Sequence, residues 1–328
     1  MRIRHSVMLL LSCIFICQAH RYDIVVIGSG PAGCAAALYG ARANMSTLVI
    51  AGDAVGGQLI GSHEVENWPG IIKKPGAEIM EDLYAQVQSF GAEFLHDAVV
   101  EIDFSQRPFL LTTRENGIIE ARSIIIATGS TPKRLHVPGE ELYWGNGVSS
   151  CAVCDCFLFK NKHVVVVGGG DSAVEEALQL VGYAQSVTLL VRGHEMRAAP
   201  YGQEKLKEHS DKIFVKYNSS ITEIVGTDEL GVTGVMLRDA ITGQESLFAT
   251  EGVFLAIGHT PTTQLFRHVI NLDETGHVAL NGRSQATHIP GVFVAGDVAD
   301  NRFKQAAKAA GDGVQAALEA IDFLRFDE

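Results

Sequence analysis

The chain has 328 residues, a length that predicts two domains, since one domain typically holds about 150 residues. Hydrophobic residues make up 47% and charged residues 20% of the sequence, which is typical of globular proteins and excludes a disordered or fibrous one. The net charge is −12, from 26 basic and 38 acidic residues. This balance argues against nucleic acid as a partner, because binding phosphate requires a basic face.

The N-terminus has the pattern of a secretory signal peptide. Arg2 and Arg4 precede an apolar run over residues 7–17, and the small residue Ala19 follows it. The run is too short to cross a bilayer, so we expect no integral membrane span. A short extension, or a start codon assigned upstream of the true one, would leave the same pattern. Residues 1–19 are therefore excluded from the fold prediction.

A dinucleotide-binding fingerprint follows. The apolar, β-branched run over residues 22–27 predicts a buried parallel strand, and a helix-forming run begins at Cys34. Between them the glycines of Gly-x-Gly-x-x-Gly permit a tight turn and let the backbone approach a pyrophosphate at the helix N-terminus. Its candidate ligands are Gly28, Ser29, Gly30, Pro31, Ala32 and Gly33. Asp53, twenty residues beyond Gly33, is the candidate ribose ligand, although Ala51 directly follows the predicted strand over residues 47–50.

A second copy of the fingerprint begins with the apolar run His163–Val167. Ala173 replaces its third glycine, a change that the pattern tolerates, and the candidate ligands are Gly168, Gly170, Asp171, Ser172 and Ala173. A predicted strand over residues 186–191 leads to Arg192 and Arg197, where a ribose 2′-phosphate would be bound. The second site therefore favours NADPH over NADH, unless these are simply two surface arginines.

Two nucleotide folds whose first glycines lie 140 residues apart indicate two nucleotides used in sequence, most simply a flavin and a nicotinamide. A predicted strand that ends in Gly296 and Asp297 supports the flavin, because such a carboxylate can bind a sugar-like chain; alternatively, Asp297 caps the following helix. The fold class is then α/β, with two Rossmann-like domains. The flavin domain is discontinuous and the nicotinamide domain is inserted between its halves.

Three of the six cysteines, Cys151, Cys154 and Cys156, lie in one short stretch. A Cys-x-x-Cys pair at a helix start puts both sulfurs on one turn, where the helix N-terminus favours the thiolate. A structural zinc site needs two more ligands, and the sequence has no second such pair, so we predict a redox dithiol and no metal. Inert cysteines are the remaining alternative. Asp155 is a candidate proton donor and acceptor, or a helix cap.

Together these motifs resemble the low-molecular-weight thioredoxin reductases. The resemblance runs from about residue 22 to about residue 322, and it includes Gly56–Leu59, Glu64–Gly70, Ile126–Gly129, Ala256–His259 and Gln305–Ala306 in addition to the motifs above. It implies an FAD-binding domain over residues 20–130 and 259–328. An NADPH-binding domain that carries the dithiol would then span residues 131–258.

The resemblance also implies further cofactor contacts, at Gly57, Gln58, Leu59, Asn67, Val99, Ala127, Thr128, Gly129, Ile257, Gly296, Asp297, Lys304, Gln305 and Ala306. In the family, hydride passes from NADPH to FAD, which then reduces the disulfide. Cys154 would face the flavin, Cys151 would attack the disulfide of thioredoxin, and Asp155 would protonate the leaving thiolate. Because dithiol and nicotinamide cannot both contact the flavin, the domains rotate, with hinges expected near residues 130–134 and 257–262. The usual assembly is a homodimer.

The sequence departs from the family at three positions. Gly193 stands where a second arginine is usual, Cys156 replaces a glycine, and Lys304 replaces an arginine, which keeps the charge and loses the planar fork. Cys156 either fills a small site or adds a third thiol. The resemblance implies a cytoplasmic enzyme, whereas the signal-like leader leaves a secretory, endomembrane or organellar destination open.

Two other functions fit the same architecture less well. A relative could oxidise a small dithiol with O₂ or accept electrons from ferredoxin, but neither route needs the second fingerprint and its arginines. The chain could also be a flavin-bound redox sensor without turnover. The complete dithiol, Asp155 and the two nucleotide sites argue against a sensor.

Overall fold

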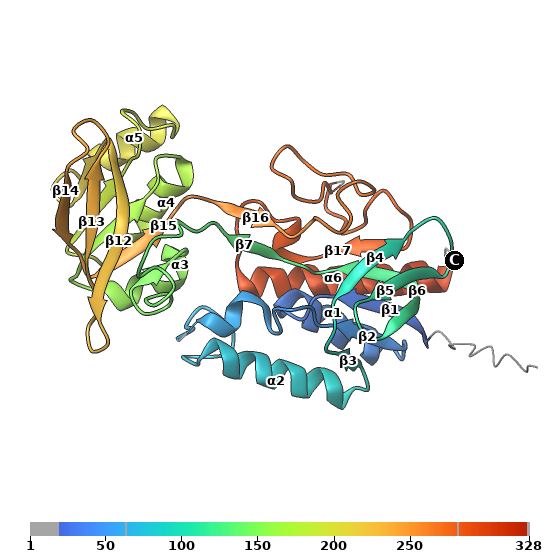
Figure 1. Ribbon diagram of the computed structural model, residues 1–328. Helices are drawn as coiled ribbons and strands as arrows, with labels where there is room; N and C mark the ends of the chain where they lie inside the picture. Colours follow the sequence, from blue (N-terminus) through green and yellow to red (C-terminus); the bar gives the residue numbers. More distant parts are fainter. Residues whose placement is uncertain (1–19, 63, 281, 327–328) are drawn as a thin grey trace, which may run out of the picture.

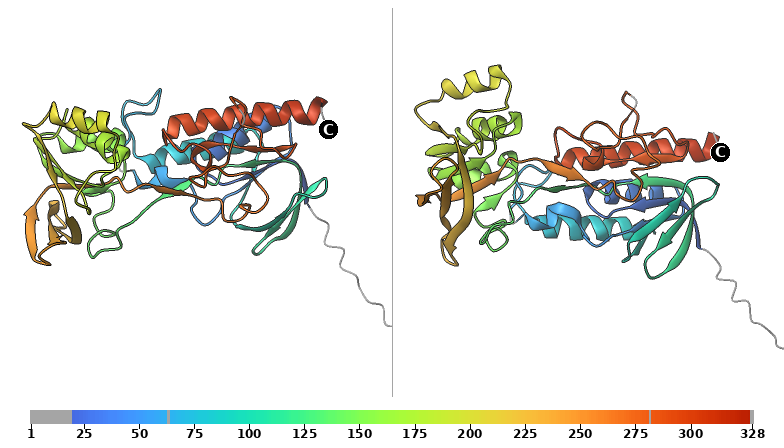
Figure 2. Two further views of the ribbon diagram at one scale, coloured as in Figure 1. Left: turned by 90° about the horizontal axis from the view of Figure 1, so that it is seen from above. Right: turned by 45° about the horizontal axis from the view of Figure 1, so that its top comes forward.

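The computed structural model describes residues 20–326, apart from residues 63 and 281. The predicted signal segment over residues 1–19 lies outside the described part of the chain. Figures 1 and 2 show two lobes, each built around its own sheet, with two chain segments passing between them. Among the residues described, no helix combines the length and apolar character that a membrane crossing requires.

The first lobe is built on a seven-stranded sheet with the order β3-β2-β1-β6-β5-β4, and β17 pairs with the end of β6. Parallel pairing joins β3, β2, β1, β6 and β17, whereas β4 and β5 are antiparallel. The strands are β1 (His20–Ile27), β2 (Thr47–Ile50), β3 (Glu93–Leu95), β4 (Val99–Asp103), β5 (Phe109–Thr113), β6 (Gly117–Ile126) and β17 (Val292–Val294).

Side chains of β1 alternate between two apolar layers, as the period of a strand requires. Ile24 and Val26 pack with the helices α1 (Pro31–Arg42), α2 (Gly76–Ser89) and α6 (Ala306–Phe326), and Val25 and Ile27 pack on the other face. Helices α1 and α6 can approach closely because Gly313 has no side chain. A Cβ at this position would lie only 2.1 Å from the Ala32 carbonyl oxygen. This packing fixes the start of α1 against the sheet.

The second lobe has a five-stranded, all-parallel sheet with the order β11-β10-β9-β15-β8. One face packs against three helices and the other packs against a three-stranded antiparallel meander. The sheet strands are β8 (Val148–Ser149), β9 (His163–Val167), β10 (Ser186–Leu190), β11 (Ile213–Lys216) and β15 (Gly252–Leu255). The covering elements are α3 (Ala152–Asp155), α4 (Asp171–Leu180), α5 (Pro200–Lys207), β12 (Ser219–Thr227), β13 (Gly231–Asp239) and β14 (Glu245–Ala249). Three short 3₁₀ helices, η1 (Gly57–Gly61), η2 (Cys156–Phe159) and η3 (Gly296–Val298), lie in the connections.

A two-stranded antiparallel ribbon links the lobes. It consists of β7 (Ser130–Pro132) and β16 (His259–Pro261), which Figure 1 shows between the two sheets. Both strands fall within the segments predicted as hinges. The domain boundaries at residues 130 and 258 stay predictions.

The α/β fold class with two Rossmann-like sheets is confirmed, whereas single strand ends differ from the prediction. The first strand begins two residues early, at His20, because β6 extends far enough to pair with it at Ile119. The strand expected over residues 186–191 ends at Leu190. The meander β12–β14 was not predicted.

Candidate active site

The first glycine-rich turn lies at the carboxyl end of β1. Gly28 has φ +110°, and a Cβ there would lie 2.3 Å from the Ala127 carbonyl oxygen. A Cβ at Gly33 would lie 1.9 Å from the Gly28 carbonyl oxygen, so only glycine permits this contact between strand, turn and helix. Helix α1 begins with Pro31, and its N-cap residue Gly30 makes no side-chain capping bond. The first N–H groups of a helix lack partners within the helix, which makes this end a suitable site for an anion.

The neighbouring loops tighten this turn. The Ser29 hydroxyl donates to the Ala51 carbonyl (3.0 Å) and accepts from the Gly56 N–H (3.1 Å), which joins the turn to the loop after β2. Gly57 lies directly beside Gly30, because a Cβ on it would be 3.1 Å from the Gly30 Cα. The backbone can therefore approach a dinucleotide from two sides.

A partly buried carboxylate, Asp297, lies just beyond β17 in η3. Burial raises its pKa to about 6, and the charge of Asp300 acts in the same direction. Asp297 lies inside η3, whose N-cap residue is Ala295, and α6 begins only at Ala306, so Asp297 is the N-cap residue of neither helix. A carboxylate that burial has stripped of water suits the hydroxyl groups of a sugar-like chain, so the residues at this sheet edge fit a flavin dinucleotide.

Several other predicted flavin ligands meet where the two lobes approach each other. Asn67 Nδ2 donates to Gln305 Oε1 (3.4 Å), and Gln305 Nε2 lies 3.9 Å from Cys151 Sγ. Gln58 donates to the carbonyl of Ser130 in the ribbon, and Thr128 Oγ1 donates to the Thr262 carbonyl (2.7 Å). Asn67 and Gln305, 238 positions apart in the sequence, thus meet next to Cys151, whereas Gln58 bonds to the ribbon and Thr128 to the residue that follows it.

The remaining predicted flavin contacts are spread more widely. Leu59 is buried in the core with α2, Val99 begins β4, and Ile257 packs against the core of the second lobe. Lys304 adopts φ +48° and its ammonium donates to the Asn301 carbonyl (2.7 Å). Asp53 is exposed and forms a bidentate ion pair with Arg114, at 2.7 and 3.0 Å. Its assignment to the ribose stays a prediction.

The second glycine-rich turn repeats the first at the carboxyl end of β9. Gly168 has φ +149°, and a Cβ on it would lie 2.6 Å from the Ala256 carbonyl oxygen. Asp171 begins α4 and its Oδ1 accepts from the Ala199 N–H (2.7 Å). The Gly169 carbonyl accepts from the N–H groups of Arg197 (2.6 Å) and Ala198 (3.0 Å). These bonds hold the loop with the exposed Arg192 and Arg197 beside the turn.

The dithiol begins α3. Cys151 and Cys154 form a disulfide with their Cα atoms 5.3 Å apart. Cys151 is the N-cap residue, and its Sγ accepts from the Cys154 N–H at 3.2 Å. A backbone donor aimed at sulfur stabilises a thiolate there once the disulfide opens.

Asp155 ends α3, and its Oδ2 accepts from the Ser149 hydroxyl at 2.5 Å. Ser149 Oγ in turn accepts from the Cys151 N–H (3.0 Å), so the carboxylate connects to the backbone of the first cysteine. Asp155 is also the N-cap residue of η2, where its side chain makes no capping hydrogen bond. Ser149 itself was not predicted, and its hydroxyl carries no sequence signal beyond closeness to the cysteines.

Glu176 is the second site residue that the sequence prediction missed. It extends from α4, and its Oε2 accepts from the Ala152 N–H (2.5 Å) at the first residue of the dithiol helix. Burial raises the pKa of Glu176 to about 7, and Asp155 and Glu175 add to the rise. The sequence does contain an indication of this position. Glu176 follows Ala173 by three residues and precedes Leu180 by four, a spacing that places it on the side of α4 that faces the core.

Two cysteines outside the pair are buried thiols. Cys156 is 4% exposed and packs in the core beneath α3 with Phe159, so it fills space in the position of the expected glycine. Burial raises its thiol pKa. Burial also raises the pKa of Cys34 to about 12, which keeps this thiol protonated and unreactive.

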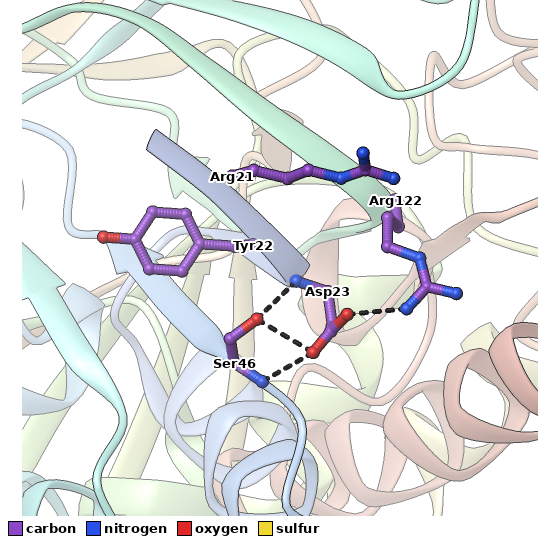
Figure 3. Close-up of a pocket in the computed structure, with 5 residues that line it drawn as sticks. All are labelled: Arg21, Tyr22, Asp23, Ser46 and Arg122. Carbon is purple, nitrogen blue, oxygen red and sulfur yellow. Dashed lines mark hydrogen bonds and ion pairs between the residues drawn. The ribbon is translucent and has the colours of Figure 1, made fainter. Parts of the chain in front are cut away.

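A polar pocket at the amino end of β1 lies apart from these groups, since the first glycine-rich turn follows the other end of the strand. Figure 3 shows the Asp23 carboxylate between Ser46 and Arg122. It accepts from Ser46 N (2.9 Å), Ser46 Oγ (2.8 Å) and Arg122 Nη1 (2.7 Å). These bonds connect β1 to the start of β2 and to β6, so we assign Asp23 a structural role.

Comparison with known proteins agrees with this geometry. Residues 22–313 match the family model described as pyridine nucleotide-disulphide oxidoreductase. The thioredoxin reductase of Neurospora crassa is 42% identical over 311 residues, which cover 92% of this chain and 93% of that protein. The chain therefore belongs to the pyridine nucleotide-disulphide oxidoreductase family, among the thioredoxin reductases.

Solved structures extend the similarity to the fold. The thioredoxin reductase from Giardia duodenalis has a TM-score of 0.88 at 38% identity and covers 94% of this chain and 100% of its own. The FR conformation of the Lactococcus lactis thioredoxin reductase, also 38% identical, has a TM-score of 0.63 over 93% of this chain and 99% of its own. At equal identity, the lower score indicates a different overall arrangement of the same fold.

Proposed function

We propose that this protein is an NADPH-dependent thioredoxin reductase. The first lobe would hold FAD and the second NADPH as the source of electrons for the Cys151–Cys154 disulfide, and the resulting dithiol would reduce oxidised thioredoxin. The observation that carries the proposal is the position of the disulfide: Cys151 Sγ lies 3.9 Å from Gln305, next to the residues that we assign to the flavin. When bound there, FAD supplies a two-electron carrier between a hydride donor and a disulfide.

The first lobe would hold FAD through the turn at Gly28, Gly30 and Gly33, with Gly57 on its other side. Asp297 would bind the sugar-like chain, and Gln305 and Ala306 would face the ring. The fit rests on the close backbone approach at Gly28 and on the buried carboxylate. Each of these contacts would lie at the carboxyl edge of the parallel sheet, where such folds bind nucleotides.

The second lobe would hold NADPH at the Gly168 turn, with Gly170, Asp171, Ser172 and Ala173 around the phosphates. Arg192 and Arg197 would bind the 2′-phosphate, and the backbone bonds of Gly169 support this by keeping their loop beside the turn. Gly193, where the family usually has a further arginine, carries no charge. We therefore expect the enzyme to prefer NADPH over NADH, but less strongly than a relative with arginine at this position.

In the dithiol step, Cys151 is the nucleophile toward thioredoxin, and Cys154 faces the flavin. The N–H of Cys154, which already points at Cys151 Sγ, stabilises the attacking thiolate. Asp155, held by Ser149, would take the proton that a thiol of the pair gives up and pass it to the thiolate that leaves. These roles need no residue outside α3 and the strand before it.

Turnover would require a second arrangement of the lobes, because in the family the dithiol and the nicotinamide cannot both contact the flavin. The β7–β16 ribbon is the hinge of this motion. The difference in TM-score between two equally similar solved structures supports such a rearrangement. We also propose that the protein is a homodimer.

The test is an anaerobic titration of the purified flavin-loaded protein with NADPH and, separately, with NADH. We expect NADPH to bleach the flavin absorbance and oxidised thioredoxin to restore it. If NADPH leaves the flavin oxidised, the nicotinamide site is not functional, and a ferredoxin-fed reductase or a dithiol oxidase replaces this proposal.

A further inference from the structure

Glu176 is a carboxyl group at the dithiol helix that the proposed mechanism does not use. Helix α4 packs against α3, and Glu176 Oε2 lies 2.5 Å from the N–H of Ala152, the residue that directly follows Cys151. Ala152 is fully buried, so this bond is shielded from water. The bond connects the first turn of the redox helix to an ionisable group in the adjacent helix.

The surroundings of Glu176 make its charge costly. The α3 side supplies the carboxylate of Asp155 together with the two sulfurs, and Glu175 is a second anion on α4 itself. Cys156 in η2 is neutral and bonds to Gln179, and α5 contributes the apolar Leu206 to the same core. The Ala152 N–H is the partner that favours the charged form. Burial dominates and raises the pKa of Glu176 to about 7.

Reduction of the disulfide adds negative charge beside this group. Two electrons and one proton open the S–S bond to one thiol and one thiolate, and a helix start favours the thiolate. A new anion near Glu176 raises the affinity of its carboxylate for a proton. The second proton of the two-electron reduction therefore has a site on Glu176 instead of on sulfur.

We propose that Glu176 is a positioning residue that holds the start of the dithiol helix through Ala152 and takes up a proton from solvent when the Cys151–Cys154 disulfide is reduced. In this reaction one disulfide and one carboxylate take up two electrons and two protons. The products are one thiol, one thiolate and one carboxylic acid. The electrons come from the reduced flavin in turnover, so the proposal rests on the proposed function.

The variant Glu176→Gln separates the two parts of this role. Its amide oxygen can still accept from the Ala152 N–H, so the helix start is held, but the side chain no longer titrates. Glu176→Ala removes both. Glu204→Gln, on the exposed face of α5, is the matched control for loss of one carboxylate nearby.

The measurement is the equilibrium between dithiol and disulfide in dithiothreitol redox buffers between pH 6 and 9, without NADPH or thioredoxin. Alkylation followed by mass spectrometry of the Cys151–Cys154 peptide gives the reduced fraction. Each proton taken up on reduction makes the equilibrium constant, corrected for the buffer, change about tenfold per pH unit. Between about pH 7 and 8 we expect about fiftyfold per unit for the wild type and Glu204→Gln, because Glu176 in the disulfide form is about half protonated at pH 7 and almost fully ionised at pH 8. For Glu176→Gln and Glu176→Ala we expect about tenfold.

Equal slopes in the wild type and Glu176→Gln would overturn the proton role, because a purely structural role would leave the pH dependence unchanged. If Cys151 and Cys154 fail to exchange reversibly even in the wild type, the proposed function fails as well. Reversible exchange with unchanged slopes would refute the role of Glu176 alone.

Discussion

Gln305 Nε2 lies 3.9 Å from Cys151 Sγ, although the two residues are 154 positions apart and belong to different lobes. Gln305 directly precedes α6, and its own Oε1 accepts from Asn67. The contact fixes the arrangement of this structure as the one in which the disulfide faces the first lobe.

Replacing either cysteine of the pair separates the two half-reactions. We expect Cys151→Ser and Cys154→Ser to reduce thioredoxin only at background rate, while NADPH still reduces the flavin at a comparable rate. Cys156→Ala, which changes a buried thiol beneath the same helix, should keep activity. Steady-state thioredoxin reduction and anaerobic flavin bleaching measure the two steps. Wild-type reductase activity in either serine variant would show that the pair is not the redox centre.

Restoring an arginine at residue 193 should strengthen the preference for NADPH. A Cβ at Gly193 would be 3.7 Å from the nearest heavy atom, an ordinary contact, so the longer side chain fits. A charge-assisted hydrogen bond contributes about 1.5–3 kcal/mol, so Gly193→Arg should raise the ratio of kcat/KM for NADPH to that for NADH by about tenfold to a hundredfold. An unchanged ratio would remove residue 193 from cofactor selection.

A single methyl group at Gly28 should abolish flavin binding. The added Cβ would lie 2.3 Å from a backbone oxygen at a residue with φ +110°, so the turn must shift away from the pyrophosphate position. We expect Gly28→Ala to purify with little flavin absorbance per mole of protein. Gly311→Ala is the control, because it lies on the exposed side of α6 with open space around it and should stabilise the helix by about 0.5–1 kcal/mol. Normal flavin content in Gly28→Ala would contradict the assignment of this turn.

Asp297 should make the flavin-free protein less stable at neutral pH. Its folded-state pKa of about 6 lies above the usual value of 3.8, so the ionised form is disfavoured by folding. The cost is about 3 kcal/mol above pH 7 and fades as the pH falls through 6 toward 4, because the folded state then binds the proton first.

Urea denaturation of the flavin-free protein tests this cost. Asp297→Asn should be more stable than the wild type at pH 7.5 by about 1–3 kcal/mol, with a gap that narrows toward pH 4, and it should bind flavin more weakly. Asp322→Asn, an exposed change on α6, should show no such gap. A gap that is independent of pH would exclude titration of Asp297 as its cause.

Local geometry explains which features could be predicted from the sequence. Each glycine turn depends on a few adjacent residues, and Gly28 and Gly168 have the contacts that the motif requires. The disulfide was likewise predictable, because the spacing of Cys151 and Cys154 brings their sulfurs to one helical turn.

Features that depend on tertiary neighbours were not predictable in the same way. The partner of Asp53 is Arg114, 61 residues away, and nothing near Asp53 in the sequence indicates it. The partner of Glu176 is the N–H of Ala152, 24 residues away, and no motif near Glu176 indicates that contact. The meander β12–β14 was missed because its strands mix polar and apolar residues and carry no motif.

The ribbon between the lobes has a consequence for the path of catalysis. Its strands are in register through three residue pairs, from His259–Pro132 to Pro261–Ser130. Two hydrogen-bonded strands bend and twist together far more readily than they slide apart, so they act as one flexible strap with few degrees of freedom. In the proposed rotation, a lobe carried on such a strap would return to the same few orientations in every cycle, and the cysteine pair would reach its electron donor along a restricted path.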